Sequence, residues 1–201
     1  MTNPISLEPG KYYHVYNRGN NRENIFNEER NYAYFLKLYA FHVGPVVDTF
    51  AYCLLRNHFH LAIRVKTTKD LTGLANLSGL PPTPSQAFAN FFNAYAKAFN
   101  KAYQRTGALF QRPFGRIEVT TEAYLYRLVT YIHQNPSRHG FVADFREWPY
   151  SSYHALLSEK TTQLKREDVL EWFGGRERLV AVHDQPFPEG LLPILAPDDF
   201  D

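Results

Sequence analysis

The sequence predicts an α+β fold, a single domain in which helices pack on an antiparallel β-sheet, with a helical extension at the C-terminus. Segments of strand-like alternation and of helical spacing follow one another in the order β-α-β-β-α-β-α. The connection between two of these strands is too short to hold a helix, and hydrophobic residues make up 44% of the 201 residues, enough for a core. We expect the helices to lie on one face of the sheet.

Periodicity and turn residues define the elements of the first half. Tyrosine and valine are frequent and alternate with other residues over 11–16, which predicts a strand. Apolar residues at helical spacing over 27–42 predict a helix with Asn27 as its N-cap. Two apolar runs, 46–55 and 59–65, are separated by so few residues that they predict an antiparallel hairpin.

Two long helices are predicted in the second half. Aromatic residues gather on one face of 85–103, and residues 109–120 between the two helices are extended in character. The next helix begins near residue 121 and is expected to end near Asn135, because Pro136 disfavours helical geometry in the residue before it. The remaining predicted elements are short helices after residue 67, at 151–158 and at 166–173, the last followed by a proline-rich tail.

Charge is distributed unevenly along the chain. Residues 1–140 carry a net charge of +8 and residues 141–201 a net charge of −6, so the overall value of +2 conceals a basic body and an acidic segment. A basic body predicts a polyanionic partner, and nucleic acid is the most common one. Ordinary variation between surface segments is the alternative interpretation.

Composition excludes several classes. The single cysteine, Cys53, excludes an internal disulfide framework and a multi-cysteine zinc site. No apolar run reaches the roughly 18 residues of a transmembrane helix, and the first residues do not resemble a signal peptide. We therefore expect a cytoplasmic protein with no membrane partner.

The segment His58-Phe59-His60 is the strongest local signal for chemistry. Residues two apart on a strand point to the same face, so His58 and His60 lie together while Phe59 faces the opposite layer. Two neutral imidazoles can hold a divalent transition ion, or magnesium or manganese where oxygen ligands complete the shell. Two histidines on a solvated sheet face are the alternative.

The helix predicted at 121–135 carries a second candidate group. Arg127, Tyr131 and Asn135 fall on one flank of its apolar face, and Tyr131 and Asn135 are one turn apart. A phenol at this position could act as a nucleophile, with Arg127 near a phosphate and Asn135 supplying an oxygen ligand. Since the chain has 14 tyrosines, packing is the alternative role for Tyr131.

Five motifs between residues 12 and 155 resemble those of the single-tyrosine HUH transposases, and within them the REP-associated tyrosine transposases. The matching segments are Tyr13-His14-Val15-Tyr16-Asn17-Arg18-Gly19, Asn57-His58-Phe59-His60-Leu61, Leu109-Phe110-Gln111-Arg112, Tyr131-Ile132-His133-Gln134-Asn135-Pro136 and Trp148-Pro149-Tyr150-Ser151-Ser152-Tyr153. The resemblance implies an HUH fold of the ferredoxin-like kind over residues 1–155. Residues 156–201 carry no motif of this family, and we expect them to form an acidic C-terminal extension.

The same resemblance implies an enzyme that cleaves and rejoins single-stranded DNA beside short hairpins. It matches Tyr131 to the nucleophile, which would form a 5′-phosphotyrosine intermediate, and His58 and His60 to the metal-binding pair. Asn135 matches the polar residue that completes the shell of Mg²⁺ or Mn²⁺. It leaves open whether the protein is a monomer or a homodimer.

Several side chains are candidates for contacts with DNA. Exposed aromatic residues, for which we expect Tyr12, Tyr16 or Phe114, could stack on unpaired bases. The candidates for phosphate contacts are Arg18, Arg22, Arg112, Arg116 and Arg127, each of which could instead be a solvated surface arginine.

Two other functions fit the same residues. A metal-dependent hydrolase would use the histidine pair to activate water and would leave Tyr131 idle. A catalytically silent protein that binds DNA hairpins would retain the basic body without cleavage.

Overall fold

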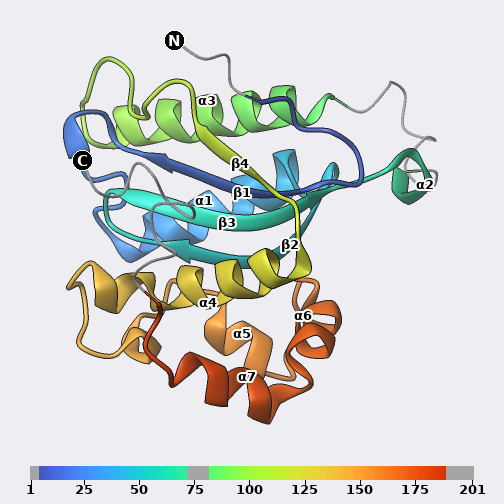
Figure 1. Cartoon of the computed structure of the whole chain (residues 1–201). Coiled ribbons are helices and arrows are strands. Elements are labelled where there is room, and N and C mark those ends of the chain that lie inside the picture. The colour runs from blue at the N-terminus through green and yellow to red at the C-terminus, as the bar shows by residue number, and fades with distance from the viewer. Residues whose placement is uncertain (1–4, 72–81, 189–201) are drawn as a thin grey trace.

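The computed structural model describes residues 5–71 and 82–188 (Figure 1). Its centre is an antiparallel sheet with the strand order β2-β3-β1-β4, which confirms the α+β class. In chain order the elements are β1 (Tyr12–Arg18), η1 (Asn20–Arg22), α1 (Glu29–His42), β2 (Val47–Leu54), β3 (His58–Val65), α2 (Thr68–Leu71), α3 (Pro84–Ala102), β4 (Gly115–Val119), α4 (Glu122–Arg138), η2 (Phe145–Glu147), α5 (Tyr153–Leu157), α6 (Arg166–Phe173) and α7 (Arg176–His183).

The strand register decides which residues share a face of the sheet. The hairpin of β2 and β3 is antiparallel, as expected, and β1 lies antiparallel on the other side of β3. Tyr16 is opposite His60 and Arg18 is opposite His58 across the β1–β3 pair. The central position of β1 in the sheet therefore brings the end of the first strand beside the histidine pair.

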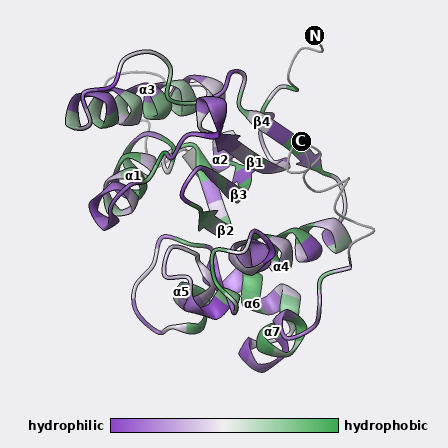
Figure 2. Cartoon of the chain, turned by 90° about the vertical axis from the view of Figure 1, so that its left-hand side faces the viewer, coloured by the Kyte–Doolittle hydropathy of each residue, from purple (hydrophilic) through white to green (hydrophobic). Residues whose placement is uncertain are grey.

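Helices cover both faces of the sheet, whereas the sequence led us to expect one. One face packs against α1 and α3, and the other packs against α4, with α5, α6 and α7 beyond it (Figures 1 and 2). The reason lies in β3, where Leu61, Ala62 and Ile63 are all buried although they alternate between faces. A strand that is apolar on both sides needs a cover on both sides.

Aromatic rings fill the face covered by α1 and α3. The Phe35 ring lies 4.7–5.1 Å, between ring centroids, from those of Phe59, Phe91 and Tyr95. The Tyr95 hydroxyl donates a 2.6 Å hydrogen bond to the carbonyl of Ile25, so its polar end is satisfied. The aromatic face expected for the helix at 85–103 is confirmed, since its members Phe88, Phe91, Phe92, Tyr95 and Phe99 are all buried.

Helix α4 continues past the point where the sequence predicted its end. It runs through Pro136 to Arg138, and the backbone N–H of His139 still bonds to the carbonyl of Asn135. A proline inside a helix removes one backbone hydrogen bond and disfavours helical geometry in the residue before it. Residues 128–136 are buried without a break, so packing outweighs this local cost.

Two further expectations differ from the structure. Helix α1 has Glu28 rather than Asn27 as its N-cap. The side-chain oxygen of Asn31, three residues into the helix, accepts from the backbone N–H of Glu28, as in a capping box. The segment after 173 was expected to be a proline-rich tail, but it contains α7. Gly174 and Gly175, at φ 76° and 107°, provide the left-handed turn that ends α6 and starts α7. Among the described residues, no helix is long and apolar enough for a membrane span.

A chain of buried hydrogen bonds fastens α7 to α4 and to the start of α5. His183 Nδ1 must donate to the carbonyl of Leu179, at 2.7 Å, so its Nε2 accepts from His133 Nδ1, at 2.8 Å. His133 Nε2 then accepts from the Ser152 hydroxyl at 2.7 Å. Both rings are neutral here, because burial lowers the pKa of His133 well below its usual value and that of His183 to about 4.

Acid should therefore weaken the fold through these two rings. The unfolded chain binds protons at histidine near pH 6.5, so the stabilisation from neutral His183 is complete above that pH and is lost as the pH falls toward about 4. Between pH 7.5 and 5, we expect His183 to account for a loss of roughly 2 kcal/mol in the free energy of unfolding measured with urea. His183→Gln should show the smaller pH dependence, whereas His42→Gln should behave as wild type; equal slopes for both variants would contradict this account.

Candidate active site

His58 and His60 lie on the same face of the sheet, as their spacing predicted, and α4 covers that face. Their ring centroids are 5.2 Å apart and the rings are nearly perpendicular, at 88°. The alternative interpretation, two histidines on a solvated face, is wrong, because the two residues are only 4% and 1% exposed. Helix α4 lies over this face and excludes water from it.

Hydrogen bonds at Nδ1 orient both rings. His58 Nδ1 donates to the side-chain oxygen of Asn57 at 2.7 Å, and His60 Nδ1 lies 2.9 Å from His14 Nε2. Since Nδ1 of each ring is engaged, a ligand bound by the pair would meet the buried Nε2 atoms. This is the arrangement of a metal-binding histidine held by a second partner.

Tyr131 and Asn135 lie on the side of α4 that faces the pair. The Tyr131 ring is 2% exposed and stands edge-on to His60, with centroids 5.6 Å apart at 81°. One turn beyond Asn135, the ring of His139 lies 4.7 Å from that of His58. Asn135 is therefore between a residue that contacts His60 and a residue that contacts His58.

The side-chain amide of Asn135 is a buried polar group without a hydrogen-bond partner among the described residues. It is fully buried, and neither its oxygen nor its nitrogen forms a hydrogen bond within the described part of the chain. A buried polar group in this state costs about 1–3 kcal/mol. A ligand that bonds to the amide oxygen would remove the part of that cost that comes from the oxygen.

Two imidazoles and an amide oxygen fit a weakly held divalent ion. In residues 5–71 and 82–188, no set of three histidine, cysteine or carboxylate side chains could hold a metal. The buried amide oxygen of Asn135, which has no hydrogen-bond partner among the described residues, is a candidate third ligand beside His58 and His60. Imidazoles suit divalent transition ions, and such a site can hold Mg²⁺ or Mn²⁺ where the amide oxygen, water and phosphate oxygens fill the other positions.

The sequence-based reasoning missed three side chains beside these groups. His14 on β1 contacts His60, His139 contacts His58, and the ring of Phe187 lies 5.7 Å from that of Tyr131. His139 follows Asn135 by four residues, as Asn135 follows Tyr131. It was missed because the helix was expected to end at Asn135. His14 depends on the pairing of two distant strands, for which the sequence has no local signal.

The five candidate arginines are not gathered at one place. Arg18 is half-buried on β1, directly opposite His58. Arg116 is on the other face, with its guanidinium 4.0 Å over the Phe114 ring and 3.4 Å from the Ser85 hydroxyl of α3, and burial lowers its pKa. The remaining three, Arg22 on η1, Arg112 after the Phe110 bridge and Arg127 on α4, are exposed.

A groove of about 490 Å³ runs between α3 and the loop 107–114. Phe92, Phe110 and Phe114 supply apolar lining, and Lys97 and Arg112 supply positive charge. The backbone N–H of Gln111 bonds to the carbonyl of Arg18 at 2.9 Å, which ties the loop to the end of β1. The groove therefore begins at the end of the sheet that holds His58.

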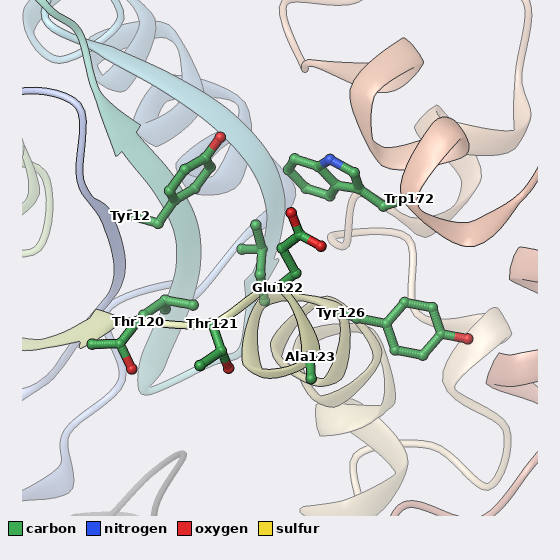
Figure 3. A pocket seen from close by; sticks show the side chains of 9 residues that line it. Tyr12, Thr120, Thr121, Glu122, Ala123, Tyr126 and Trp172 are labelled. Carbon is green, nitrogen blue, oxygen red and sulfur yellow. The ribbon is translucent and has the colours of Figure 1, made fainter.

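A second hollow, of about 470 Å³, lies at the opposite end of α4 (Figure 3). Tyr12 and Trp172 line it, with ring centroids 6.2 Å apart, and the side chain of Glu122 lies close to Trp172. Tyr12 is thus half-buried in an aromatic cluster with Phe50, not exposed as expected. A carboxylate beside it makes this hollow a poor place for a phosphate backbone.

Comparison with known proteins agrees with the resemblance found in the motifs. No protein-family model matches the chain. A Haemophilus influenzae protein named "Putative REP-associated tyrosine transposase" is 29% identical over 109 residues, which take in 53% of this chain and 59% of that relative. A solved structure of a REP-associated tyrosine transposase bound to a REP hairpin has the same fold, with a TM-score of 0.54 and 18% identity over 79% of this chain and 86% of that one.

Proposed function

We propose that this chain is a transposase that cleaves and rejoins single-stranded DNA beside hairpins, with Tyr131 as its nucleophile. The observation that carries the proposal is the placement of Tyr131 edge-on to His60, with the buried, unsatisfied amide of Asn135 one turn further along α4. The names of the Haemophilus relative and of the hairpin-bound structure support a DNA substrate of this kind.

In the proposed reaction, the phenolic oxygen of Tyr131 forms a bond to phosphorus, and the bond from phosphorus to the 3′ oxygen breaks. The phenolic proton is lost, and the leaving 3′ oxygen takes up a proton to become a hydroxyl. The product is a 5′-phosphotyrosine. Because one phosphodiester bond has been exchanged for another, the free energy of the bond that was cut is retained. A second 3′-hydroxyl can attack this ester and restore free Tyr131, so rejoining needs no nucleotide cofactor.

His58, His60 and Asn135 would hold Mg²⁺ or Mn²⁺ next to this phosphate. A bound ion of this kind neutralises charge that develops on the non-bridging phosphate oxygens. The bonds at Nδ1 to Asn57 and His14 keep the two imidazoles in place. Burial of the pair and of Tyr131 lowers the local dielectric constant, which strengthens each of these interactions.

The strand would enter from the His58 end of the site. His139 is exposed there and Arg18 is half-exposed, while the His60 end lies deeper under α4. From Arg18 the groove between α3 and the loop 107–114 continues past Arg112, with the partly exposed Phe114 as a surface for an unpaired base. An unpaired strand fits this route, because its bases and its phosphates can both reach the protein.

Replacement of Tyr131 by phenylalanine should abolish the covalent adduct and leave hairpin affinity unchanged, since only a hydroxyl is removed. We expect adduct formation to fall by on the order of 10³-fold or more, measured with labelled hairpin DNA and Mn²⁺ after denaturation. The control is Tyr126→Phe, whose ring stacks on Phe173 at 4.1 Å. Cleavage of DNA by wild type without any adduct would favour the hydrolase, and binding without cleavage would favour the silent binder.

Asn135→Ala should raise the Mn²⁺ concentration needed for half-maximal adduct formation by about tenfold, because water can replace an amide ligand only in part. High Mn²⁺ should then restore the wild-type rate. Ser137→Ala, two residues further along the same helix, should retain the wild-type dependence on Mn²⁺. An identical Mn²⁺ requirement in the Asn135 variant and the control would remove Asn135 from the site.

Arg112→Ala should weaken binding of single-stranded DNA and make it less sensitive to salt. Each phosphate contact contributes about −0.7 to −0.9 to the slope of log affinity against log salt concentration, so this variant should lose one such increment. Arg178→Ala removes the same charge from an exposed position on α7 and is the matched control. The groove would be the wrong route if both variants lost affinity and slope equally.

A further inference from the structure

His14 contacts both His60 and Tyr131, although it is neither a metal ligand nor the nucleophile in the proposed reaction. It lies in the middle of β1 and is fully buried. Its Nε2 lies 2.9 Å from His60 Nδ1, and the two rings meet edge to edge with centroids 5.1 Å apart and planes 27° from parallel. The His14 ring stands edge-on to Tyr131 at 6.1 Å.

A hydrogen bond between two imidazole nitrogens requires a proton on one and a lone pair on the other. In one arrangement His60 carries its proton on Nδ1 and donates it to His14, which leaves a lone pair on His60 Nε2. In the other, His14 donates, and a neutral His60 carries its proton on Nε2. Only the first arrangement lets His60 Nε2 act as a metal ligand.

We propose that His14 is a positioning residue that holds His60 in its metal-binding tautomer and orientation. The inference rests on the proposed metal site. His14 Nε2 accepts the proton of His60 Nδ1, and this hydrogen bond, which lies close to the planes of both rings, fixes the rotation of the His60 imidazole. Because the His14 ring also contacts Tyr131, one side chain sets the spacing between the ligand and the nucleophile.

The surroundings of His14 favour this role over simple packing. A side chain that only filled space here would be apolar, like its β3 partner Ala62, which lies opposite it on the same face. A buried imidazole instead costs free energy unless both nitrogens are satisfied. The hydrogen bond from His60 Nδ1 to His14 Nε2, at 2.9 Å, offsets part of this cost.

Two variants separate the acceptor from the ring. His14→Phe retains an aromatic ring and removes the acceptor, while His14→Gln offers an amide oxygen to His60 Nδ1. Mn²⁺ binding is measured on the full chain without DNA, by the electron paramagnetic resonance signal of the free ion. We expect His14→Phe to bind Mn²⁺ between 10- and 100-fold more weakly, roughly the range for lost partners of metal-binding histidines, and His14→Gln to recover part of the loss.

Metal-free hairpin binding should change little in a folded variant, while the thermal midpoint of His14→Phe should fall, because the buried N–H of His60 loses its acceptor. Wild-type Mn²⁺ affinity in a folded His14→Phe protein would overturn the positioning role and leave the metal site intact. Wild-type protein that binds Mn²⁺ no better than His58→Ala would overturn the proposed metal site, and the role of His14 with it.

A measurement on the unaltered protein covers the case in which the variants do not fold. With Mg²⁺ present, ¹⁵N NMR of the histidine side chains should show both His60 and His14 protonated on Nδ1. A His14 protonated on Nε2 in the Mg²⁺-loaded protein would overturn the inference.

Discussion

The packing of α4 on the histidine face of the sheet is the constraint on which the rest of the site depends. Small side chains make the close approach possible, since Ala51 is opposite Ala62 and Cys53 is opposite His60 under the helix. Larger residues there would lift α4 and separate Tyr131 from His60. The same contact that buries an apolar helix face thus brings the proposed nucleophile to the proposed ligands.

The C-terminal helices act on the site through α4. Val169, Phe173 and Leu179 share a hydrophobic core with α4. His133, on α4, forms hydrogen bonds with Ser152 and with His183 of α7. The sheet therefore holds one side of α4, and the C-terminal helices α6 and α7 hold the other. The helices α6 and α7, in the acidic segment of the chain, therefore have a structural role: they hold α4 in place.

Local periodicity accounts for what the sequence could predict. The shared face of His58 and His60 follows from strand alternation, and the proximity of Tyr131 and Asn135 follows from the helical repeat. The contact of His14 with His60 depends on the pairing of β1 with β3, and the two residues are 46 positions apart in the sequence. The length of α4 was underestimated because burial of residues 128–136 outweighs the local effect of Pro136. Tertiary packing, not local preference, decides these features.

Mapping the residue that becomes linked to DNA tests the central claim most directly. Trypsin cleaves after Arg116, Arg127 and Arg138, so Tyr131 falls in the peptide 128–138 as its only tyrosine, while Tyr124 and Tyr126 fall in the peptide 117–127. After reaction with hairpin DNA and Mn²⁺, denaturation and nuclease digestion, mass spectrometry should find a nucleotide attached to the peptide 128–138. A nucleotide on the peptide 117–127, or on any other peptide in place of 128–138, would contradict the account.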